Sequence, residues 1–323
     1  ALLGALLGKL RATSVPADDL STGALPKLSV ALPICTDEVD NIFARAALAD
    51  AAAIGGWELC NISTSAEAAA EALARKYPRM PDIDTVDVLI VDVGAASTWV
   101  AAVRLCAEAA EGWTAEVLTE NSDSGLGCVD FDAVIFDHFS EVVRAKYGEP
   151  VAAGSRAGLR LLDGCERLRK LLSTMPEAAT TVENLVEGVD VPLTLSRDEL
   201  ASSCASLYER LRAVIDRVLA HEGLQPFASV EASGGGTRMP SVQAVMSEAL
   251  SASAVGAALG DVKFGAKLDD ASTALGAAFL GKVRHSALAA SAATPAAGDA
   301  PAPAEADVAA ALTFCGLLAG DEL

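Results

Sequence analysis

Apolar residues follow two different spacings along the first eighty residues, and each spacing predicts one kind of element. Some segments place apolar residues three and four positions apart, which is typical of helices, while others are short unbroken apolar runs, typical of buried strands. Ser65 is a candidate N-cap, and Gly55-Gly56 is a plausible helix end. The predicted helices are 1–13, 37–56 and 65–77, and the predicted strands are 27–34 and 57–63.

The pattern changes near residue 87. Three apolar runs, 87–94, 98–106 and 113–120, are separated by short connections. Such spacing predicts an antiparallel meander. Two long helical patterns follow at 129–147 and 155–173.

The last part of the chain alternates hairpin, helix and strand patterns. Residues 180–196 alternate and break at Glu187-Gly188, which predicts a hairpin. Ser196 with Glu199 forms a capping-box pattern for a helix that is expected to reach about residue 221. The remaining predictions are a strand at 227–233, a glycine turn, helices at 240–251 and 268–283 with an acidic cap on the latter, a linker rich in Ala and Pro at 287–306, and a tethered helix at 307–318.

Composition limits the classes of protein that this order of elements can represent. The chain has 323 residues, of which 52% are apolar and only 4% aromatic, so a folded α/β chain with two lobes and a core of small side chains is expected. A net charge of −20 argues against a nucleic-acid partner, which would require a basic face. Since no run of eighteen apolar residues occurs, no membrane span is expected.

Cysteines, histidines and the N-terminal segment point to no special chemistry. The seven cysteines are widely spaced and odd in number, and no C-x-x-C occurs, so we expect buried thiols rather than disulfides or zinc ligands. The three histidines are scattered, which argues against a metal site built on them. The segment "ALLGALLGKLRA" is interpreted as a core helix, with a signal-peptide remnant as the alternative.

Three segments carry candidate chemistry. In "VEASGGGTRMP" a strand runs into Gly234, Gly235 and Gly236 and then into a helix. Residues without Cβ atoms either form a tight connection or let a ligand approach the backbone N–H groups.

The second candidate is "VLIVDVGAAST" (88–98), a buried strand that ends in an acidic residue. Asp92 can hold a metal-bound water, while N–H groups from Gly94 to Ser97 face a phosphate. The alternative is an aspartate that caps a turn.

The third candidate is the helical segment "CERLRKLLS" (165–173). Glu166, Arg169, Lys170 and Ser173 lie three to four residues apart, which places them along one helix face. This face either binds a nucleotide base and ribose or is a solvated charged stripe.

Five segments in this order resemble the seventy-kilodalton heat-shock chaperones of the actin-like ATPase superfamily. The resemblance covers roughly residues 1–283 and is strongest to the large hundred-and-ten and hundred-and-seventy-kilodalton branch, because "DVGAAST" has fewer glycines than the small chaperones carry there. The segments are "DVGAAST", "LGCVDFDAVIFDHF" (126–139), "LRLLDGCERLRKLLS" (159–173), "VEASGGGTRMPSVQAV" (230–245) and "LDDASTALGAA" (268–278).

The resemblance implies an actin-like α/β fold and an adenine-nucleotide site. It implies that Gly234–Gly236 let adenosine and phosphates lie on the backbone, and that Arg238 stacks near the base opposite Arg169 and Lys170. Glu166 and Ser173 would reach the ribose and adenine, and Asp270 would close the site from the last helix. The implied cofactor is ATP or ADP with Mg²⁺, and Asp92 would hold the metal through water.

Several departures from the family pattern bear on activity. The family has an earlier stretch with a first phosphate hairpin and a catalytic lysine, and this chain is expected to start after it. The family's Asn-Glu-Pro-Thr-like stretch is matched to "CNISTSAEAAA", in which Asn61 is kept and Ile62 stands where the glutamate belongs. Ala95, Ala96 and Cys128 stand at positions usually held by glycine.

The resemblance therefore predicts a partial, degenerate nucleotide-binding domain, and the departures leave open that it binds no nucleotide. The expected division is a partial first lobe (1–86), a second lobe (87–267), a closing helix (268–286), the linker (287–306) and a tail helix (307–323).

Two functions follow from this interpretation. One is a pseudo-ATPase that acts as a structural subunit or an exchange-factor-like co-chaperone, with protein partners in a larger assembly or an intact chaperone. The other is a working chaperone ATPase whose N-terminal part lies elsewhere. The "GDEL" end resembles an endoplasmic-reticulum retention signal with Gly320 in place of Lys or His, and the alternative is an ordinary acidic surface end. Cytoplasm and organelles therefore both stay open.

Overall fold

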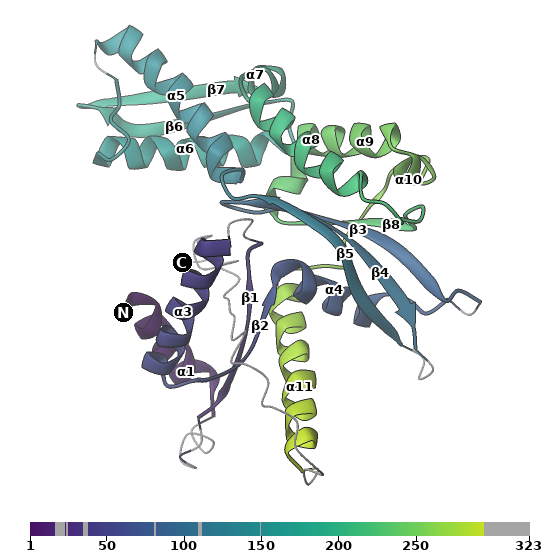
Figure 1. Ribbon diagram of the computed structural model, residues 1–323. Helices are drawn as coiled ribbons and strands as arrows, with labels where there is room; N and C mark the ends of the chain where they lie inside the picture. Colours follow the sequence, from purple (N-terminus) through teal and green to yellow (C-terminus); the bar gives the residue numbers. More distant parts are fainter. Residues whose placement is uncertain are drawn as a thin grey trace. The chain divides into compact units, whose positions relative to one another are not determined.

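The computed structural model describes residues 1–16, 23, 25–34, 38–80, 82–108, 112–148 and 150–293. Most predicted elements are present in these residues (Figure 1). The helices are α1 (Leu2–Ser14), α3 (Glu38–Gly55), α4 (Ser65–Lys76), α5 (Cys128–Tyr147), α6 (Arg156–Leu172), α7 (Arg197–Ser203), α8 (Ala205–Leu219), α9 (Pro240–Ala252), α10 (Ala254–Ala257) and α11 (Ser272–Ala293). The strands are β1 (Lys27–Leu32), β2 (Glu58–Thr64), β3 (Thr85–Val93), β4 (Thr98–Ala107), β5 (Trp113–Asp123), β6 (Glu177–Val186), β7 (Val189–Ser196), β8 (Ser229–Ser233) and β9 (Phe264–Gly265).

The chain forms two compact units that are not continuous in sequence. Unit 1 contains Ala1–Ile90, Ala101–Glu120 and the described residues from Gly265 onward, and unit 2 contains Val91–Val100 and Asn121–Phe264. Strands β3, β4 and β5 each contribute residues to both units. The predicted lobe boundary near residue 86 stays a prediction, and β3, which starts at Thr85, is the first strand shared by the two units.

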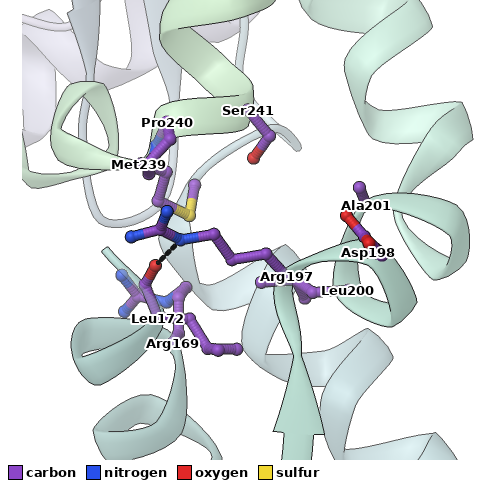
Figure 2. Close-up of a pocket in the computed structure, with 9 residues that line it drawn as sticks. All are labelled: Arg169, Leu172, Arg197, Asp198, Leu200, Ala201, Met239, Pro240 and Ser241. Atoms are coloured by element: carbon purple, nitrogen blue, oxygen red, sulfur yellow. Dashed lines mark hydrogen bonds between the residues drawn. The ribbon is translucent and has the colours of Figure 1, made fainter. Parts of the chain in front are cut away.

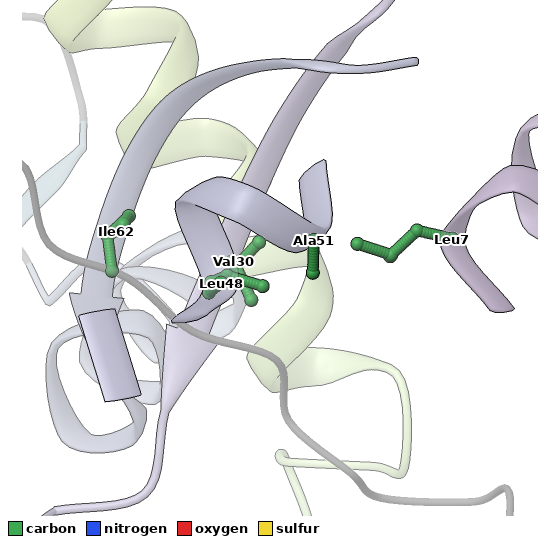
Figure 3. Close-up of a cluster of buried hydrophobic side chains, with 5 residues drawn as sticks. All are labelled: Leu7, Val30, Leu48, Ala51 and Ile62. Atoms are coloured by element: carbon green, nitrogen blue, oxygen red, sulfur yellow. The ribbon is translucent and has the colours of Figure 1, made fainter. Parts of the chain in front are cut away.

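Unit 1 is organised around the parallel pair β1–β2, in which Val30 lies opposite Ile62. These two side chains face an apolar cluster with Leu7 of α1 and with Leu48 and Ala51 of α3 (Figure 3). Parallel strands need cover on both faces. Helices α4 and α11 pack against each other, and α11 also packs on β1 and β2.

Small side chains let α11 approach its neighbours closely. A Cβ atom at Gly276 would overlap the carbonyl oxygen of Ala68 on α4, and one at Gly281 would overlap the Ser29 hydroxyl on β1. Ala31, Ala68 and Ala277 form a small core cluster here. Glycine at these two positions, together with the small alanine side chains beside them, therefore allows this close packing.

The largest sheet has the strand order β5-β4-β3-β8-β9. The order confirms the predicted meander of β3, β4 and β5. In unit 2, β6 and β7 form the predicted antiparallel hairpin around Glu187-Gly188, where Gly188 has a φ of 72°. Helix α6 packs on β6, and α5 packs on α6.

Several element boundaries differ from the prediction. Thr64, not Ser65, caps α4, because its side chain accepts the Glu67 N–H while the Glu67 side chain accepts the Thr64 N–H. Ser196 caps α7 with Glu199 as predicted, but the helix breaks at Cys204 and resumes as α8. Helix α11 begins at Ser272 and continues through Ala293, into the predicted linker. The predicted tail helix at 307–318 lies outside the described residues.

Candidate functional site

The three glycines after β8 have different structural reasons to be glycine. Gly234 has a φ of 79°, and a Cβ atom there would overlap the carbonyl oxygen of Val93 at the end of β3. A Cβ atom at Gly236 would overlap the Val93 side chain. Around Gly235, by contrast, a Cβ atom would meet no atom within 4 Å, and the residue is exposed. Packing against Val93 therefore explains why Gly234 and Gly236 are glycines. It does not explain Gly235, whose backbone is accessible.

The residues after the glycines form one 3₁₀ turn and then α9. The Thr237 hydroxyl donates to the carbonyl oxygen of Gly234 at 2.8 Å, which closes the turn. The Gln243 side-chain amide donates to the Thr237 carbonyl oxygen at 2.9 Å. Arg238 is exposed beside the open backbone of Gly235, so both are accessible to a ligand.

The β3–β4 hairpin lies against the glycine turn through Val93 and contains Asp92. Asp92 is buried, and this burial raises its pKa to about 6, although a hydrogen bond with the Ser233 side chain opposes the rise. A carboxyl group with such a pKa is only partly ionised just below neutral pH. A bound cation would favour its charged form, so Asp92 can hold a metal-bound water only at some cost in desolvation.

The hairpin offers fewer N–H groups to a phosphate than the sequence suggested. The Gly94 N–H donates to the Ser97 carbonyl oxygen at 2.9 Å inside the hairpin and is not available to a ligand. The carbonyl oxygens of Gly94 and Ala95 accept the N–H groups of Cys128 and Val129 at the start of α5. Ala95 and Ala96 are exposed at the tip and Ser97 is half-buried, so the N–H groups of these three residues stay candidates.

The charged residues that the spacing predicts along one face of α6 differ in their burial. Glu166 and Lys170 form an exposed ion pair at 3.2 Å. Arg169 is buried and donates to both carboxyl oxygens of Asp132 on α5, at 2.7 and 3.0 Å. Burial raises the pKa of Asp132, and the bonds from Arg169 oppose that rise. Arg169 thus joins α6 to α5 in this arrangement, and its predicted role beside the base stays a prediction.

Ser173 is also occupied within its own helix. Its hydroxyl donates to the Arg169 carbonyl oxygen at 3.3 Å. A hydroxyl can exchange such a bond for one to a ribose, so this position is compatible with the predicted role without supporting it.

A pocket of about 260 Å³ lies between α6, α7 and the start of α9 (Figure 2). No sequence pattern indicated this pocket, since only Arg169 belongs to the predicted site. Arg197 extends across the pocket and donates from Nε to the Leu172 carbonyl oxygen at 2.6 Å (Figure 2). Its lining residues are Arg169, Leu172, Arg197, Asp198, Leu200, Ala201, Met239, Pro240 and Ser241.

The acidic residues before α11 have distinct roles. Asp269 accepts the Ala271 N–H and the Ser272 hydroxyl and pairs with Lys76 at 2.9 Å. Lys76 and Ser272 lower the pKa of Asp269 to about 2. Asp270 is exposed, and its predicted role in closing the nucleotide site stays a prediction.

Ile62 is not at a position where an acid could act on water. Its side chain is buried in the apolar cluster of unit 1 with Val30 and Leu48 (Figure 3). A carboxylate there would be buried among aliphatic side chains, which costs several kcal/mol without a partner (about 2–7 kcal/mol even for an uncharged polar group). Ile62 is therefore a core residue of unit 1 in this structure.

The thiols and the remaining candidate ligands are consistent with a structural role. Cys128, Cys165 and Cys204 are buried free thiols, while Cys60 and Cys106 are half-buried. Burial raises the pKa of Cys165 and Cys204 to about 12, so neither is a nucleophile near neutral pH. Among the described residues no cluster of three His, Cys, Asp or Glu side chains can hold a metal ion. No described helix has the length and apolar character needed to cross a membrane.

Comparison with known proteins identifies the family. A family model described as Hsp70 protein matches residues 6–291, and the chain belongs to this family, near its large hundred-and-ten-kilodalton branch. The fold is therefore the actin-like ATPase fold that the sequence resemblance implied.

Several curated relatives share about three tenths of their matched residues with the chain. Heat shock 70 kDa protein 14 of Arabidopsis thaliana is 27% identical over 249 residues, which are 76% of this chain and 28% of that protein. Heat shock protein 88 of Dictyostelium discoideum is 27% identical over 252 residues, 77% of this chain and 31% of the relative. A heat shock protein homolog of Lachancea kluyveri is 30% identical over 247 residues, 75% of this chain and 34% of the relative. The chain thus spans about a third of the length of these proteins.

The residues present fit an adenine nucleotide in part. Gly235, Arg238 and the Glu166–Lys170 pair are accessible groups of the kinds that bind a base and a ribose. Asp92 is placed beside the glycine turn, but its charge is disfavoured by burial. When bound, Mg²⁺ would supply charge neutralisation at the phosphates.

Proposed function

We propose that this chain is a pseudo-ATPase of the Hsp70 family that acts as an interaction subunit or as an exchange-factor-like co-chaperone of an intact chaperone. Its role in the chaperone family follows from the family itself. The specific proposal is that the chain still binds an adenine nucleotide but does not hydrolyse it.

The open backbone at Gly235 carries the proposal. Neither backbone conformation nor packing requires a glycine there, whereas Gly234 and Gly236 are explained by the end of β3. A ligand that lies on the backbone accounts for the third glycine. We therefore propose that unit 2 still binds adenosine.

The hairpin supports loss of hydrolysis. Phosphoryl transfer needs groups that orient water and neutralise the developing charge. Here the hairpin contributes one carboxyl group, Asp92, which is buried and bound to Ser233, and its tip consists of alanines.

The test is a calorimetric titration of the chain with ATP and with ADP in the presence of Mg²⁺, together with an assay of phosphate release. We expect micromolar binding that is lost in Arg238→Ala and weakened in Gly235→Ala, without turnover. Gly154→Ala is the matched control, because a Cβ atom there also meets nothing within 4 Å. Phosphate release at chaperone-like rates that requires Arg238 and Glu166 would contradict the proposal.

The second candidate is a working ATPase whose N-terminal phosphate-binding part lies outside this sequence. The position of Asp92 beside the glycine turn favours it, since that carboxyl is the one expected to hold Mg²⁺ through water. Restored turnover when the chain is joined to the missing part would support this candidate.

A further inference from the structure

The pocket between α6, α7 and the start of α9 lies within unit 2 and is lined by other residues than the proposed nucleotide surface. Gly235, Arg238 and the Glu166–Lys170 pair are not among its lining residues. Its volume of about 260 Å³ is room for about nine water molecules at about 30 Å³ each. A ligand of about ten non-hydrogen atoms fits such a space.

Most of the pocket wall is apolar. The side chains of Leu172, Leu200 and Met239 are buried, and Ala201 and Pro240 complete this part of the wall (Figure 2). Ligand sites commonly combine such a wall with a few polar groups that fix the orientation of the ligand. Because the thioether of methionine makes favourable contacts with aromatic rings, the wall favours a compact apolar group and an aromatic ring in particular.

One cation in the wall has unused hydrogen-bond donors. The Arg197 Nε atom donates to the Leu172 carbonyl oxygen at 2.6 Å, which holds the side chain across the pocket (Figure 2). A guanidinium has five N–H donors, and among the residues that the structure describes neither terminal nitrogen of Arg197 has an acceptor. The two terminal nitrogens can therefore donate to both oxygens of one carboxylate.

The other charged residues of the wall leave this cation uncompensated. Arg169 donates to both carboxyl oxygens of Asp132 on α5, so its charge is already paired. Asp198 forms no ion pair with Arg197 in the described part of the chain, and Figure 2 shows it away from the Arg197 guanidinium. Arg197 is therefore the group that selects the charge of a ligand in this pocket.

We propose that this pocket binds a small aromatic carboxylate, with the carboxylate on the terminal nitrogens of Arg197 and the ring against the apolar wall. A carboxylate joined to a compact ring occurs in free organic acids and at the C-terminus of a peptide that ends in an aromatic residue. The site does not depend on the proposed nucleotide binding, because neither Gly235 nor Arg238 contributes to it.

Calorimetric titration of the whole chain with phenylacetate, in the absence of nucleotide, tests the proposal. A ligand of about ten non-hydrogen atoms should bind in this pocket with a Kd of about 0.1–1 mM. Phenylacetamide has nearly the same shape without the charge, and acetate has the charge without the ring, so each should bind at least about tenfold more weakly. N-acetylphenylalanine distinguishes the two sources: tighter binding than phenylacetate supports a peptide C-terminus in this site, and weaker binding supports a free acid.

Variants of the chain locate the binding site. Arg197→Gln removes the charge and should weaken phenylacetate binding at least about tenfold, while phenylacetamide binding stays the same. Ala201→Leu fills part of the pocket with Arg197 in place and should also weaken phenylacetate binding at least about tenfold. Ala213→Leu, at an exposed position of α8, is the matched control and should leave binding unchanged. Arg238→Ala should leave it unchanged as well, and the melting temperature of each variant shows whether it is folded.

Several outcomes would overturn the proposal. Phenylacetamide that binds as tightly as phenylacetate would show that the Arg197 charge does not select the ligand. Phenylacetate binding that is unchanged in Ala201→Leu would place the acid outside the pocket, and binding that is lost in Arg238→Ala would place it on the proposed nucleotide surface. Absence of binding at about 10 mM phenylacetate would also overturn the proposal, whether or not the chain binds a nucleotide. If Arg197→Gln does not fold, the neutral analogue and Ala201→Leu still decide the question.

Discussion

At the scale of single residues, the glycine turn shows how packing and binding requirements can be separated. Gly234 combines a positive φ with contact to Val93, whereas Gly235 has open space over it. The sequence shows three equal glycines, and only the neighbouring strand distinguishes them. The three-residue motif could be predicted, but the role of each member could not.

Alanine at each of the two positions should give opposite results. Gly234→Ala should lower the free energy of unfolding by at least about 1–3 kcal/mol, because an L-residue is strained at this φ and its Cβ atom overlaps Val93. Gly235→Ala should leave stability within about 0.5 kcal/mol and should weaken nucleotide binding. Urea unfolding and calorimetry measure the two quantities. Equal losses of stability would mean that Gly235 is also a packing residue.

Asp92 should make stability depend on pH in a defined direction. Its pKa is raised from 3.8 to about 6 in the folded chain, so the folded state binds more protons than the unfolded state between these values. Stability conferred by its protonated form is present below about pH 4 and is lost as the pH rises through 6. The cost at pH 7 is about 3 kcal/mol, since a pKa difference of one corresponds to about 1.36 kcal/mol.

Asp92→Asn removes this cost and keeps an acceptor for Ser233. It should raise the melting temperature at pH 7.5 and have little effect at pH 4. Asp137→Asn, at an exposed position on α5, is the control. A difference from wild type that is the same at both pH values would show that burial does not penalise the Asp92 charge.

At the scale of elements, periodicity predicted most helices and strands but none of their partners. Arg169 and Lys170 look alike in "CERLRKLLS", yet one is buried against Asp132 and the other is exposed. Asp132 is 37 residues away, so no local pattern identifies the pair. Likewise, Gly276 looks like one of many small residues until the close approach of α4 gives its reason.

Breaking the pair between Asp132 and Arg169 from one side should be strongly destabilising. Asp132→Ala should lower the free energy of unfolding by about 3–5 kcal/mol, because it leaves the Arg169 guanidinium buried without its counter-charge. Glu166→Ala, which breaks an exposed pair on the same helix, should cost about 1 kcal/mol or less. Urea midpoints measure both. The double variant Asp132→Leu, Arg169→Met should recover most of the lost free energy of unfolding. If it is as unstable as Asp132→Ala, the unpaired charge of Arg169 is not the sole cause of the loss.

At the scale of the whole molecule, the chain is divided into two units by strands that serve both. Unit 1 consists of three segments, from the beginning, the middle and the end of the described chain. Unit 2 consists of the two segments between them. The resemblance predicted two lobes, but the sequence alone did not show that β4 and β5 contribute to both units. Long-range pairing, rather than local pattern, decides this division.

The net charge affects the stability of the whole molecule. Added salt tests whether the net electrostatic effect is stabilising or destabilising. The chain carries 44 acidic and 24 basic residues, so self-repulsion opposes the compact state. Salt weakens that repulsion, but it also weakens ion pairs. Most of the ion pairs in the described residues are exposed pairs within one helix. Each of them stabilises the fold by about 0.3–0.5 kcal/mol at most. The buried Arg169–Asp132 pair is screened by salt much less. Repulsion should therefore dominate, and the melting temperature should rise when NaCl is increased from about 20 mM to about 300 mM at pH 7.5. An uncharged osmolyte of equal osmolality serves as the control, and a melting temperature that falls with added salt would show that the ion pairs outweigh the repulsion.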